Sequence, residues 1–419
     1  MRVPKLRNVV IGIAIFAAVV GAGLLIAQDQ ETLRVQSPVD ASNDIFPVYL
    51  ARLLGVPLTA GDAYTVHTNG PVAFPAMIAA IERARHRISF ETYVFDAGQV
   101  AERFVTALEA AARRGVAVRM VLDSMGASSM DEAHIDRLEK AGCRIGWFNP
   151  VGQLEEANYR THRKSLVIDG DIAFIGGMGV ADHWGGATPD GPMWRDTHVE
   201  VRGPAAVYVE SAFNENWIET GGVVEPDLLT HADAAGKARS LVVWSSPEGG
   251  TNALKLLYLF AIASARRTID VQSPYLITDE STMWSLSEAR RRGVRVRLLT
   301  EGDITDAKPV KFASRALYGD LLSMGTEVYE YAPAMMHVKA TVVDDVLSIV
   351  GSANFDNRSL ELNDELNIAL FDRGVSARLT ADFEQDLRRS NRLTLEAWRA
   401  RPVHIRAREK AWSLFGELF

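Results

Sequence analysis

The feature that most constrains this chain of 419 residues is a short pattern that occurs twice with the same internal spacing. The first copy consists of His162, Lys164, Asp169, Gly176 and Gly177. The second copy consists of His337, Lys339, Asp344, Gly351 and Ser352. One short motif can match by accident, so a second copy at the same spacing is the stronger evidence. The repeat predicts that one structural unit is written twice along the chain.

Three further segments recur in the same order around this pattern. The stretches that begin at residues 84, 114 and 141 are echoed by those that begin at residues 265, 292 and 324. The offset varies only between 175 residues (162 to 337) and 183 residues (141 to 324). Loops of different length between duplicated elements produce small variations of this kind. We therefore expect a first half over 61–219, an inter-half linker over 220–240 and a second half over 241–393.

Each half alternates patterns that are typical of strands and helices. In the first half we expect strands over Ile88–Phe95 and Val116–Leu122, and helices over Val100–Arg113 and 131–140. Gly115 stands where helices commonly end. Strands separated by helices of this length indicate a sheet with helices on both faces. The expected fold class is therefore α/β, a duplicated α/β/α arrangement with two halves related by a pseudo-twofold axis.

The N-terminal residues predict a membrane location. Residues 9–27 are apolar and uncharged, and they follow an n-region (1–8) that carries Arg2, Lys5 and Arg7. Helical geometry gives this run a length of about 28 Å, close to the roughly 30 Å of a bilayer core. We expect a transmembrane anchor, with a cleaved signal peptide as the alternative. Positive charges before the span predict a cytoplasmic n-region. The chain is thus expected to be a single-pass protein of a bacterial inner membrane, with a tether over 28–60 and a periplasmic catalytic domain.

The spacing within each copy has a physical reason. The apolar run after each lysine predicts a strand, in which residues i and i+2 share a face. Each histidine therefore points the same way as its lysine. The aspartate of each copy falls at a hairpin-turn signal, and the small residues follow the next strand. We interpret these motif positions as structural: Asp169, Asp344, Gly176, Gly177, Gly351 and Ser352.

If the two halves face each other, both histidine–lysine pairs meet in one cleft. Such a cleft suits a phosphodiester, because the lysines neutralise its oxygens, one histidine attacks phosphorus and the other protonates the leaving alkoxide. Neither a metal nor a cofactor is expected, since the lysines repel a cation. The single cysteine, Cys143, excludes an intramolecular disulfide and a cysteine-rich zinc site. The net charge of −8 disfavours nucleic acid as a partner.

Histidines in this role need an acid that orients the second ring nitrogen. A strand-like stretch follows each copy of the pattern, and the alternation of these stretches places Asp196 opposite Glu365. We take Asp196 and Glu365 as the candidate orienting acids, and the alternative is that they are ordinary surface acids. The remaining histidines, including His183, are expected on the surface or in packing. The same is favoured for His198, with the alternative that it faces the cleft because it follows Asp196 by two residues.

The paired pattern resembles that of the phospholipase D superfamily, and the surrounding residues are similar to its cardiolipin synthase-like bacterial members. Three stretches carry this likeness: Asn158-Tyr159-Arg160-Thr161-His162-Arg163-Lys164, Trp194-Arg195-Asp196, and Gly351-Ser352-Ala353-Asn354-Phe355-Asp356-Asn357-Arg358-Ser359-Leu360. The resemblance covers roughly residues 60 to 395. It implies a phosphohistidine intermediate and transfer of a phosphatidyl group to an alcohol or to water. It further implies that His162 attacks and that His337 acts as acid and then base. The implied phosphate contacts are Lys164, Lys339 and Asn354.

The chain departs from the family pattern at Gly179, which stands where the second copy has Asn354. One donor to the phosphate is missing there, and losing a preorganised donor costs about 2.7–4 kcal/mol of transition-state stabilisation. Both histidine–lysine pairs are retained, so we expect an enzyme that makes cardiolipin from the membrane phospholipid phosphatidylglycerol, with phosphatidylethanolamine as a further candidate substrate. The alternatives are a phospholipase D that uses water, an exported nuclease and an inactive lipid-binding scaffold.

The C-terminal tail over 394–419 is basic and amphipathic. Two interpretations stay open for its apolar residues. They lie on an anionic lipid surface, or they pack on the domain.

Overall fold

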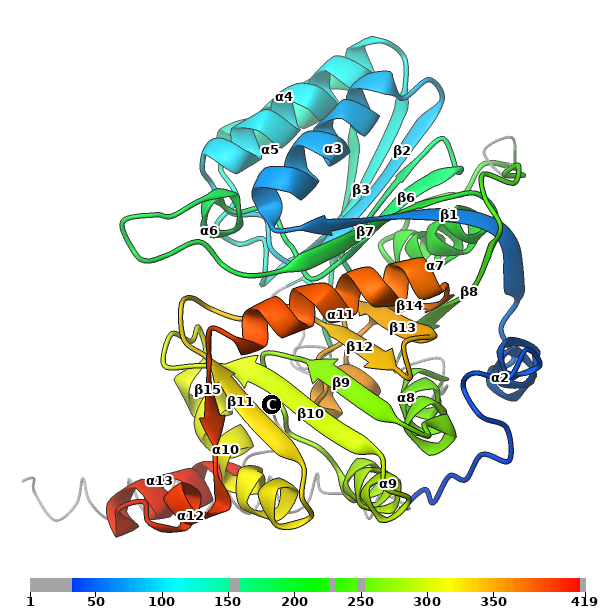
Figure 1. The fold of residues 1–419 in the computed structure, drawn as a ribbon. Helices are drawn as coiled ribbons and strands as arrows, with labels where there is room; N and C mark the ends of the chain where they lie inside the picture. The colour runs from blue at the N-terminus through cyan, green and yellow to red at the C-terminus, as the bar shows by residue number, and fades with distance from the viewer. Residues whose placement is uncertain (1–31, 151–158, 227–230, 247–252, 415–419) are drawn as a thin grey trace, which may run out of the picture.

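The computed structural model describes residues 32–150, 159–226, 231–246 and 253–414 (Figure 1). Within these ranges, none of the helices has the length and apolar character needed to cross a bilayer. The membrane span expected over 9–27 lies outside the described residues, and so do residues 415–419 of the expected tail.

Fifteen strands of the described chain form one continuous sheet. Their bounds are β1 Leu58–Thr68, β2 Arg87–Thr92, β3 Ala117–Asp123, β4 Arg144–Phe148, β5 Ser165–Ile168, β6 Ile172–Gly176, β7 Thr197–Arg202, β8 Ala238–Ser245, β9 Thr268–Gln272, β10 Arg295–Glu301, β11 Glu327–Tyr331, β12 Ala340–Val343, β13 Leu347–Gly351, β14 Glu365–Phe371 and β15 Ser390–Leu393. From its centre the sheet runs β1-β7-β6-β5-β2-β3-β4 in one direction and β8-β14-β13-β12-β9-β10-β11-β15 in the other. The order is the same in both directions up to β15, so the predicted duplication is confirmed.

Helices cover both faces of the sheet in each half (Figure 1). Their bounds are α2 Phe46–Leu54, α3 Gly70–Arg83, α4 Gln99–Arg113, α5 Glu132–Ala141, α6 Asp182–Gly185, α7 Ala205–Glu219, α8 Ala253–Ser264, α9 Glu280–Arg291, α10 Lys308–Ser323, α11 Arg373–Leu387, α12 Leu395–Arg399, α13 Val403–Ser413 and the π-helical turn η3 Arg358–Leu362. Helices α3 and α4 bury apolar residues in the core of the first half, and α8 and α9 do so in the second. The expected α/β/α class is therefore confirmed.

A third hydrophobic core lies between the two halves and contains residues of both. The strands β1 and β8 pair antiparallel at the centre of the sheet. A cluster of buried apolar residues combines β6 and β7 of the first half with β12, β13 and β14 of the second. Helix α7 contacts β8, and α11 contacts β1, so each of these helices reaches the opposite half. Apolar burial on this scale fixes how the halves face each other.

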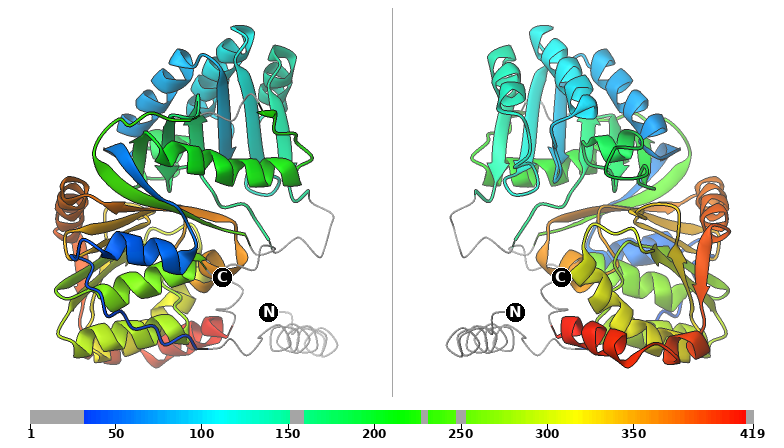
Figure 2. Two further views of the ribbon diagram at one scale, coloured as in Figure 1. Left: turned by 90° about the vertical axis from the view of Figure 1, so that its right-hand side faces the viewer. Right: turned by 90° about the vertical axis from the view of Figure 1, so that its left-hand side faces the viewer.

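The described part of the expected tether over 28–60 includes a helix that packs on the second half. This helix is α2, whose residues Phe46 and Leu50 are fully buried in the core of the second half. Figure 2 shows α2 beside α8, far along the chain from it. The apolar spacing of α2 gives it a face that must be buried, and the second half provides the surface. Strand β1 also begins at Leu58, before the expected boundary at residue 61.

The strand expected over Ile88–Phe95 ends early, at Thr92. The backbone of Val94 accepts a hydrogen bond from Val180, and Phe95 forms an isolated bridge with the same residue. The chain therefore turns away from β3 and carries Tyr93 out of the sheet.

The described part of the tail packs on the second half. The side chain of Trp398 is buried against Tyr318, with ring centroids 5.6 Å apart. Glu409 is buried as well, and it forms ion pairs with Arg315 and Arg401. Of the two interpretations left open, packing on the domain is confirmed for Trp398 of α12, whereas Val403 and Leu414 at the ends of α13 are exposed.

Candidate active site between the two halves

Each histidine–lysine pair lies just before a hairpin whose turn is locked by the motif aspartate. Asp169 and Asp344 both have φ of 53°, a left-handed conformation that asparagine and aspartate tolerate. The Asp169 carboxylate accepts backbone hydrogen bonds from residues 85, 86 and 87. The Asp344 carboxylate accepts them from residues 266, 267 and 268. Both aspartates thus tie the hairpins β5–β6 and β12–β13 to the neighbouring strands, away from the cleft.

Two short backbone bridges bring the histidines together. Thr161 bridges Asp364, and the amide of His162 donates to the Asp364 carbonyl at 2.8 Å. Arg195 bridges Met336 in the same way, and the amide of His337 donates to the Arg195 carbonyl at 2.8 Å. Each bridge joins the residues before one histidine to the residues before the acid of the other half.

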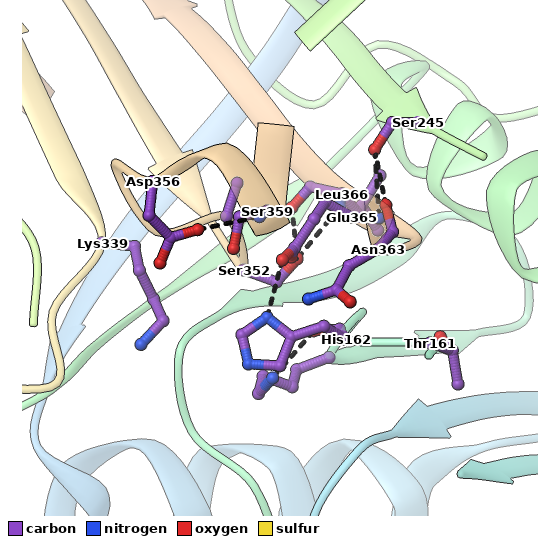
Figure 3. Close-up of polar contacts among 12 residues, drawn as sticks. Thr161, His162, Ser245, Lys339, Ser352, Asp356, Ser359, Asn363, Glu365 and Leu366 are labelled. Carbon is purple, nitrogen blue, oxygen red and sulfur yellow. Dashed lines mark hydrogen bonds and ion pairs between the residues drawn. The ribbon is translucent and has the colours of Figure 1, made fainter. Parts of the chain in front are cut away.

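The orienting acids therefore cross between the halves. The Nδ1 atom of His162, in the first half, lies 2.8 Å from Oε1 of Glu365 in the second (Figure 3). The Nδ1 atom of His337, in the second half, lies 2.7 Å from Oδ2 of Asp196 in the first. Both acids are fully buried, so neither is an ordinary surface residue. Each contact leaves the Nε2 atom of its histidine as the nitrogen that faces the cleft.

The two acids are held in different ways. The Ser352 hydroxyl donates to Oε2 of Glu365 at 2.5 Å, as Figure 3 shows. Its counterpart Gly177 has no side chain, and a Cβ there would lie 2.4 Å from Oδ1 of Asp196. Asp196 instead accepts a hydrogen bond from the Trp184 indole at 3.0 Å. Gly176 and Gly351 end β6 and β13 and lie against the neighbouring strands β7 and β14.

Burial shapes the charges of the two histidine–lysine pairs. It lowers the pKa of His162 to about 4 and that of His337 well below its usual value. It also lowers the pKa of Lys164 to about 7 and that of Lys339 to about 8, against the attraction of the orienting acids. Each imidazole is thus neutral in the empty cleft. The lowered pKa values leave the two lysines partly deprotonated near neutral pH, and a bound anion favours their charged form.

The orienting acids respond to burial with different outcomes. Burial raises the pKa of Asp196, with Lys339 opposing it. Burial also acts to raise the pKa of Glu365, but His162, Lys164 and the Ser352 hydroxyl together hold it below the usual value. Glu365 is therefore the more firmly ionised of the two, and it accepts the Nδ1–H of His162.

The four residues differ in how they meet the cleft. Lys339 places its Nζ 3.0 Å from Nε2 of His337 and also donates to the His337 carbonyl. Within the part of the chain that the structure describes, the Nζ atom of Lys164 donates to the backbone carbonyl of His162 at 2.7 Å and to no other group. Within the described residues, Nε2 of His162 has no hydrogen-bond partner. The first histidine therefore presents an unoccupied nitrogen lone pair to the cleft.

A cavity of about 510 Å³ is lined by three of these four residues, and the fourth, Lys339, contacts it through His337. It is lined by the predicted residues His162, Lys164, His337 and Asn354, and by residues that sequence reasoning missed or assigned elsewhere: Tyr93, Asp96, Arg160, His183, Trp184, Trp194, Tyr275, Asp306, Asp356, Arg358 and Asn363. His183 packs on Trp184 and Trp194, as one of its two expected roles allows, and this packing also places it in the cavity wall. Among the described residues, no cluster of histidine, cysteine and carboxylate side chains is placed to hold a metal ion.

Part of what was missed had a sequence signal. The register pairs Gly176 with His198 and Gly351 with Asn367, so Trp194 and Asn363 are equivalent positions, each four residues before the paired residue. Aligning the halves through these strands would have placed both residues at the cleft. Tyr93 gave no such signal, because it enters the cavity only where the chain leaves β2.

The comparisons with known proteins agree on the family. The family model described as "Cardiolipin synthase, PLD-like domain" matches residues 77–183 and 258–387. A cardiolipin synthase of Geobacillus kaustophilus is 33% identical over 369 residues, which cover 86% of this chain and 73% of that protein. Cardiolipin synthase 2 of Bacillus anthracis is 33% identical over 358 residues, which cover 84% of this chain and 70% of that protein.

Solved structures show the same fold. The crystal structure of a phosphatidylserine synthase from Haemophilus influenzae covers 89% of this chain and 100% of its own, with a TM-score of 0.70 and 12% identity. A polyphosphate kinase from Porphyromonas gingivalis covers 92% of this chain and 56% of its own, with a TM-score of 0.57 and 13% identity. The matched family model, the identity to its members and the duplicated histidine–lysine site together show that this chain belongs to the cardiolipin synthase family of phospholipase D-like proteins.

Proposed function

We propose that this protein is a phosphatidyltransferase that makes cardiolipin from two molecules of phosphatidylglycerol. The observation that carries the proposal is the pair of crossed histidine–acid contacts in one cavity. Two oriented imidazoles and two ammonium groups close to one another are suited to a phosphodiester. The ammonium groups neutralise its charge, one imidazole attacks phosphorus and the other protonates the ester oxygen that leaves. The relatives described as cardiolipin synthases support cardiolipin as the product.

In the first step, Nε2 of His162 forms a bond to phosphorus. Its neutral state and unoccupied lone pair suit it for attack, and Glu365 stabilises the positive charge that develops on the ring. The bond from phosphorus to the glycerol head group breaks, and the leaving oxygen takes a proton from Nε2 of His337. A bound phosphodiester draws Lys339 to its own oxygens, and its negative charge favours the protonated form of His337.

In the second step, the roles of the two histidines reverse. His337 takes the proton of a hydroxyl on a second phosphatidylglycerol, and that oxygen forms a bond to phosphorus while the bond to His162 breaks. Lys164, Lys339 and Asn354 hold the phosphoryl oxygens through both steps. Asp196 keeps Nδ1 of His337 as the protonated nitrogen, so its Nε2 can both give and accept a proton.

We propose a membrane location from residues 9–27. This run would anchor the chain as a single-pass protein of the inner membrane and hold the cleft near the lipid surface. The basic n-region supports a periplasmic catalytic domain. Protease treatment of spheroplasts tests this placement, because a periplasmic domain is digested from outside and a cytoplasmic one is protected.

The activity is tested with purified full-length protein and vesicles of phosphatidylglycerol. The proposal expects cardiolipin and glycerol in equal amounts. Phosphatidic acid as the main product would show a hydrolase instead. No product from wild type, under conditions where a named family member is active, would contradict the proposal and favour a lipid-binding scaffold.

A further inference from the structure

The first half lacks the side-chain amide that the second half offers to the phosphate. Asn354 lines the cavity, whereas the equivalent Gly179 has no side chain. The space beside Gly179 is also closed, because a Cβ there would lie 2.8 Å from Cβ and 2.9 Å from the carbonyl oxygen of Val94. The Trp184 ring lies 3.2 Å away on the other side. An asparagine therefore does not fit at this position, and a missing donor must come from elsewhere.

A second amide already stands in the cavity. Asn363 lines the same space as His162, Lys164 and Asn354, and its side chain extends from the Glu365 segment toward His162 in Figure 3. The backbone of Asn363 is fixed on both sides. Its backbone N–H donates to the Arg358 carbonyl at 2.9 Å, and its backbone carbonyl accepts from the Ser245 hydroxyl at 3.2 Å. The amide group is thus held at the rim of the reaction centre by the chain that also positions Glu365.

The hydrogen-bonding state of this amide points to a ligand. Asn354 and Asn363 are each only 6% exposed, and among the described residues the Nδ2 donor of each has no hydrogen-bond partner. Buried side-chain amides are normally satisfied, and each exception needs an explanation. The unpaired Nδ2 donors of both amides are explained together if the oxygens of one bound phosphoryl group accept from them.

The position equivalent to Asn363 in the other half strengthens the assignment. Trp194 stands there, and its ring lies 5.4 Å from that of His337. The same backbone site therefore carries an apolar wall beside His337 and a polar amide beside His162. An amide suits the histidine that carries the phosphoryl group, because its NH₂ group donates to phosphoryl oxygens.

We propose that Asn363 is a phosphate-binding residue that supplies, from the second half, the amide donor that Gly179 cannot supply from the first. The inference rests on the proposed function for the identity of the phosphodiester, but not for the anion contact itself. Asn363 and Asn354 then both donate to the phosphoryl group, so both are needed when charge develops on its oxygens.

The test compares Asn363→Ala and Asn363→Asp with Asn354→Ala in the full-length protein. The matched control is Asn357→Ala, an asparagine of the same segment that does not line the cavity. Binding of inorganic phosphate is measured by titration calorimetry at constant ionic strength, kcat and KM are measured with phosphatidylglycerol, and the melting temperature is recorded for each variant.

We expect Asn363→Ala to lower kcat by about 10²- to 10³-fold, the same loss that we expect for Asn354→Ala, with weaker phosphate binding and an unchanged melting temperature. Asn363→Asp should weaken phosphate binding further, because a carboxylate repels the anion, while Asn357→Ala stays within about twofold of wild type. Phosphate binding and kcat within twofold of wild type in Asn363→Ala would overturn the inference. So would a loss of kcat that is matched by a lower melting temperature with phosphate binding unchanged.

The phosphate titration separates this inference from the proposed function. If wild type makes no cardiolipin but Asn363→Ala still weakens phosphate binding, the proposed function fails and the anion contact stands. If wild type makes cardiolipin and Asn363→Ala leaves both measurements unchanged, the proposed function stands and the assignment of Asn363 fails.

Discussion

The two halves share a backbone plan but surround their histidines differently. His162 has the Tyr93 ring at 5.5 Å, the amide of Asn363 in the same cavity and an Nε2 atom with no partner within the described residues. His337 has Trp184 and Trp194 at 5.3 and 5.4 Å, and Lys339 on its Nε2. Duplication thus provided two equivalent imidazoles, and the surrounding side chains make one of them suited to attack and the other to proton transfer.

The difference also shows why neither half is a complete site. Glu365 orients the histidine of the first half, and Asp196 orients that of the second. The backbone bridges at Thr161 and Arg195 fix this exchange. A half alone would hold a histidine without its acid, so the reaction centre exists only when the shared core is assembled.

The largest expected effect separates the two histidines by role. His162→Ala and His337→Ala should each lower turnover of phosphatidylglycerol by roughly 10⁴-fold or more. A lipid with a p-nitrophenol leaving group should restore an initial burst of nitrophenol in His337→Ala, because this leaving group departs without a proton. His162→Ala should give no burst in the same absorbance assay. A burst in His162→Ala and none in His337→Ala would reverse our assignment.

The crossed acids should show the same division at smaller magnitude. Glu365→Gln and Asp196→Asn should each reduce kcat by about 10- to 100-fold, as loss of a partner that orients a histidine does in metal sites. With the p-nitrophenyl lipid, Glu365→Gln should slow the burst through His162, whereas Asp196→Asn should leave the burst nearly intact. Equal slowing of the burst in both variants would show that the halves do not divide the work as their geometry suggests.

The pH dependence should report the lysines and the nucleophile. His162 must be neutral, which holds above its pKa of about 4, and both lysines must be charged, which fails as pH rises through about 7 for Lys164 and about 8 for Lys339. With the p-nitrophenyl lipid, whose leaving group needs no proton from His337, a profile of kcat/KM against pH should therefore rise near 4 and fall between about 7 and 8. Lys164→Arg should move the alkaline fall upward, because a guanidinium stays charged. An activity that still increases at pH 9 would contradict these charge states.

The residues that hold the two acids, Ser352 beside Glu365 and Gly177 beside Asp196, should have smaller and unequal effects on kcat. Ser352→Ala removes one hydrogen bond to Glu365, so kcat should fall by about 2- to 10-fold, corresponding to roughly 0.5–1.5 kcal/mol. Gly177→Ala places a methyl group against Asp196, so it should be the more harmful of the two. Steady-state kinetics on both variants, with melting temperatures as the control, decides the order, and a larger loss from Ser352→Ala would show that Asp196 can shift without harm.

The smallest effect on activity is expected for Asp169 and Asp344, which play the same structural part in both halves. Asp169→Asn and Asp344→Asn each weaken the carboxylate's hold on the backbone amides of the preceding strand, so each should lower the free energy of unfolding by about 1–3 kcal/mol. At a temperature where both variants stay folded, kcat should remain within about twofold of wild type. Chemical denaturation measures the first quantity, and a folded variant with a large loss of kcat would place these aspartates in the chemistry.

Much of the fold followed from local patterns. The duplicated order, the hairpins after each lysine and the structural role of Asp169 depend on spacing within a few residues, which sequence periodicity reports directly. The strand predicted from Ile88 failed at Tyr93 because pairing with Val180, a distant residue, ends it. The helix at Phe46 lay in the expected tether, and only the far core of the second half explains its burial.

The sequence predicted which residues form the site but not which histidine pairs with which acid. His162, His337, Asp196 and Glu365 could be named from the repeat, whereas their exchange across the halves depends on bridges between segments about 200 residues apart (161 to 364). Asn363 escaped because the motif of the family points to Gly179, and only the packing of Val94 shows that no side chain fits there.

Trapping the covalent intermediate tests the central claim most directly. His337→Ala protein is mixed with a p-nitrophenyl phosphatidyl lipid labelled at phosphorus and quenched in alkali, where a phosphorus–nitrogen bond survives. The labelled peptide is then mapped by mass spectrometry. We predict one phosphatidyl group on His162. Label on another residue, or none despite a burst of nitrophenol, would contradict the account.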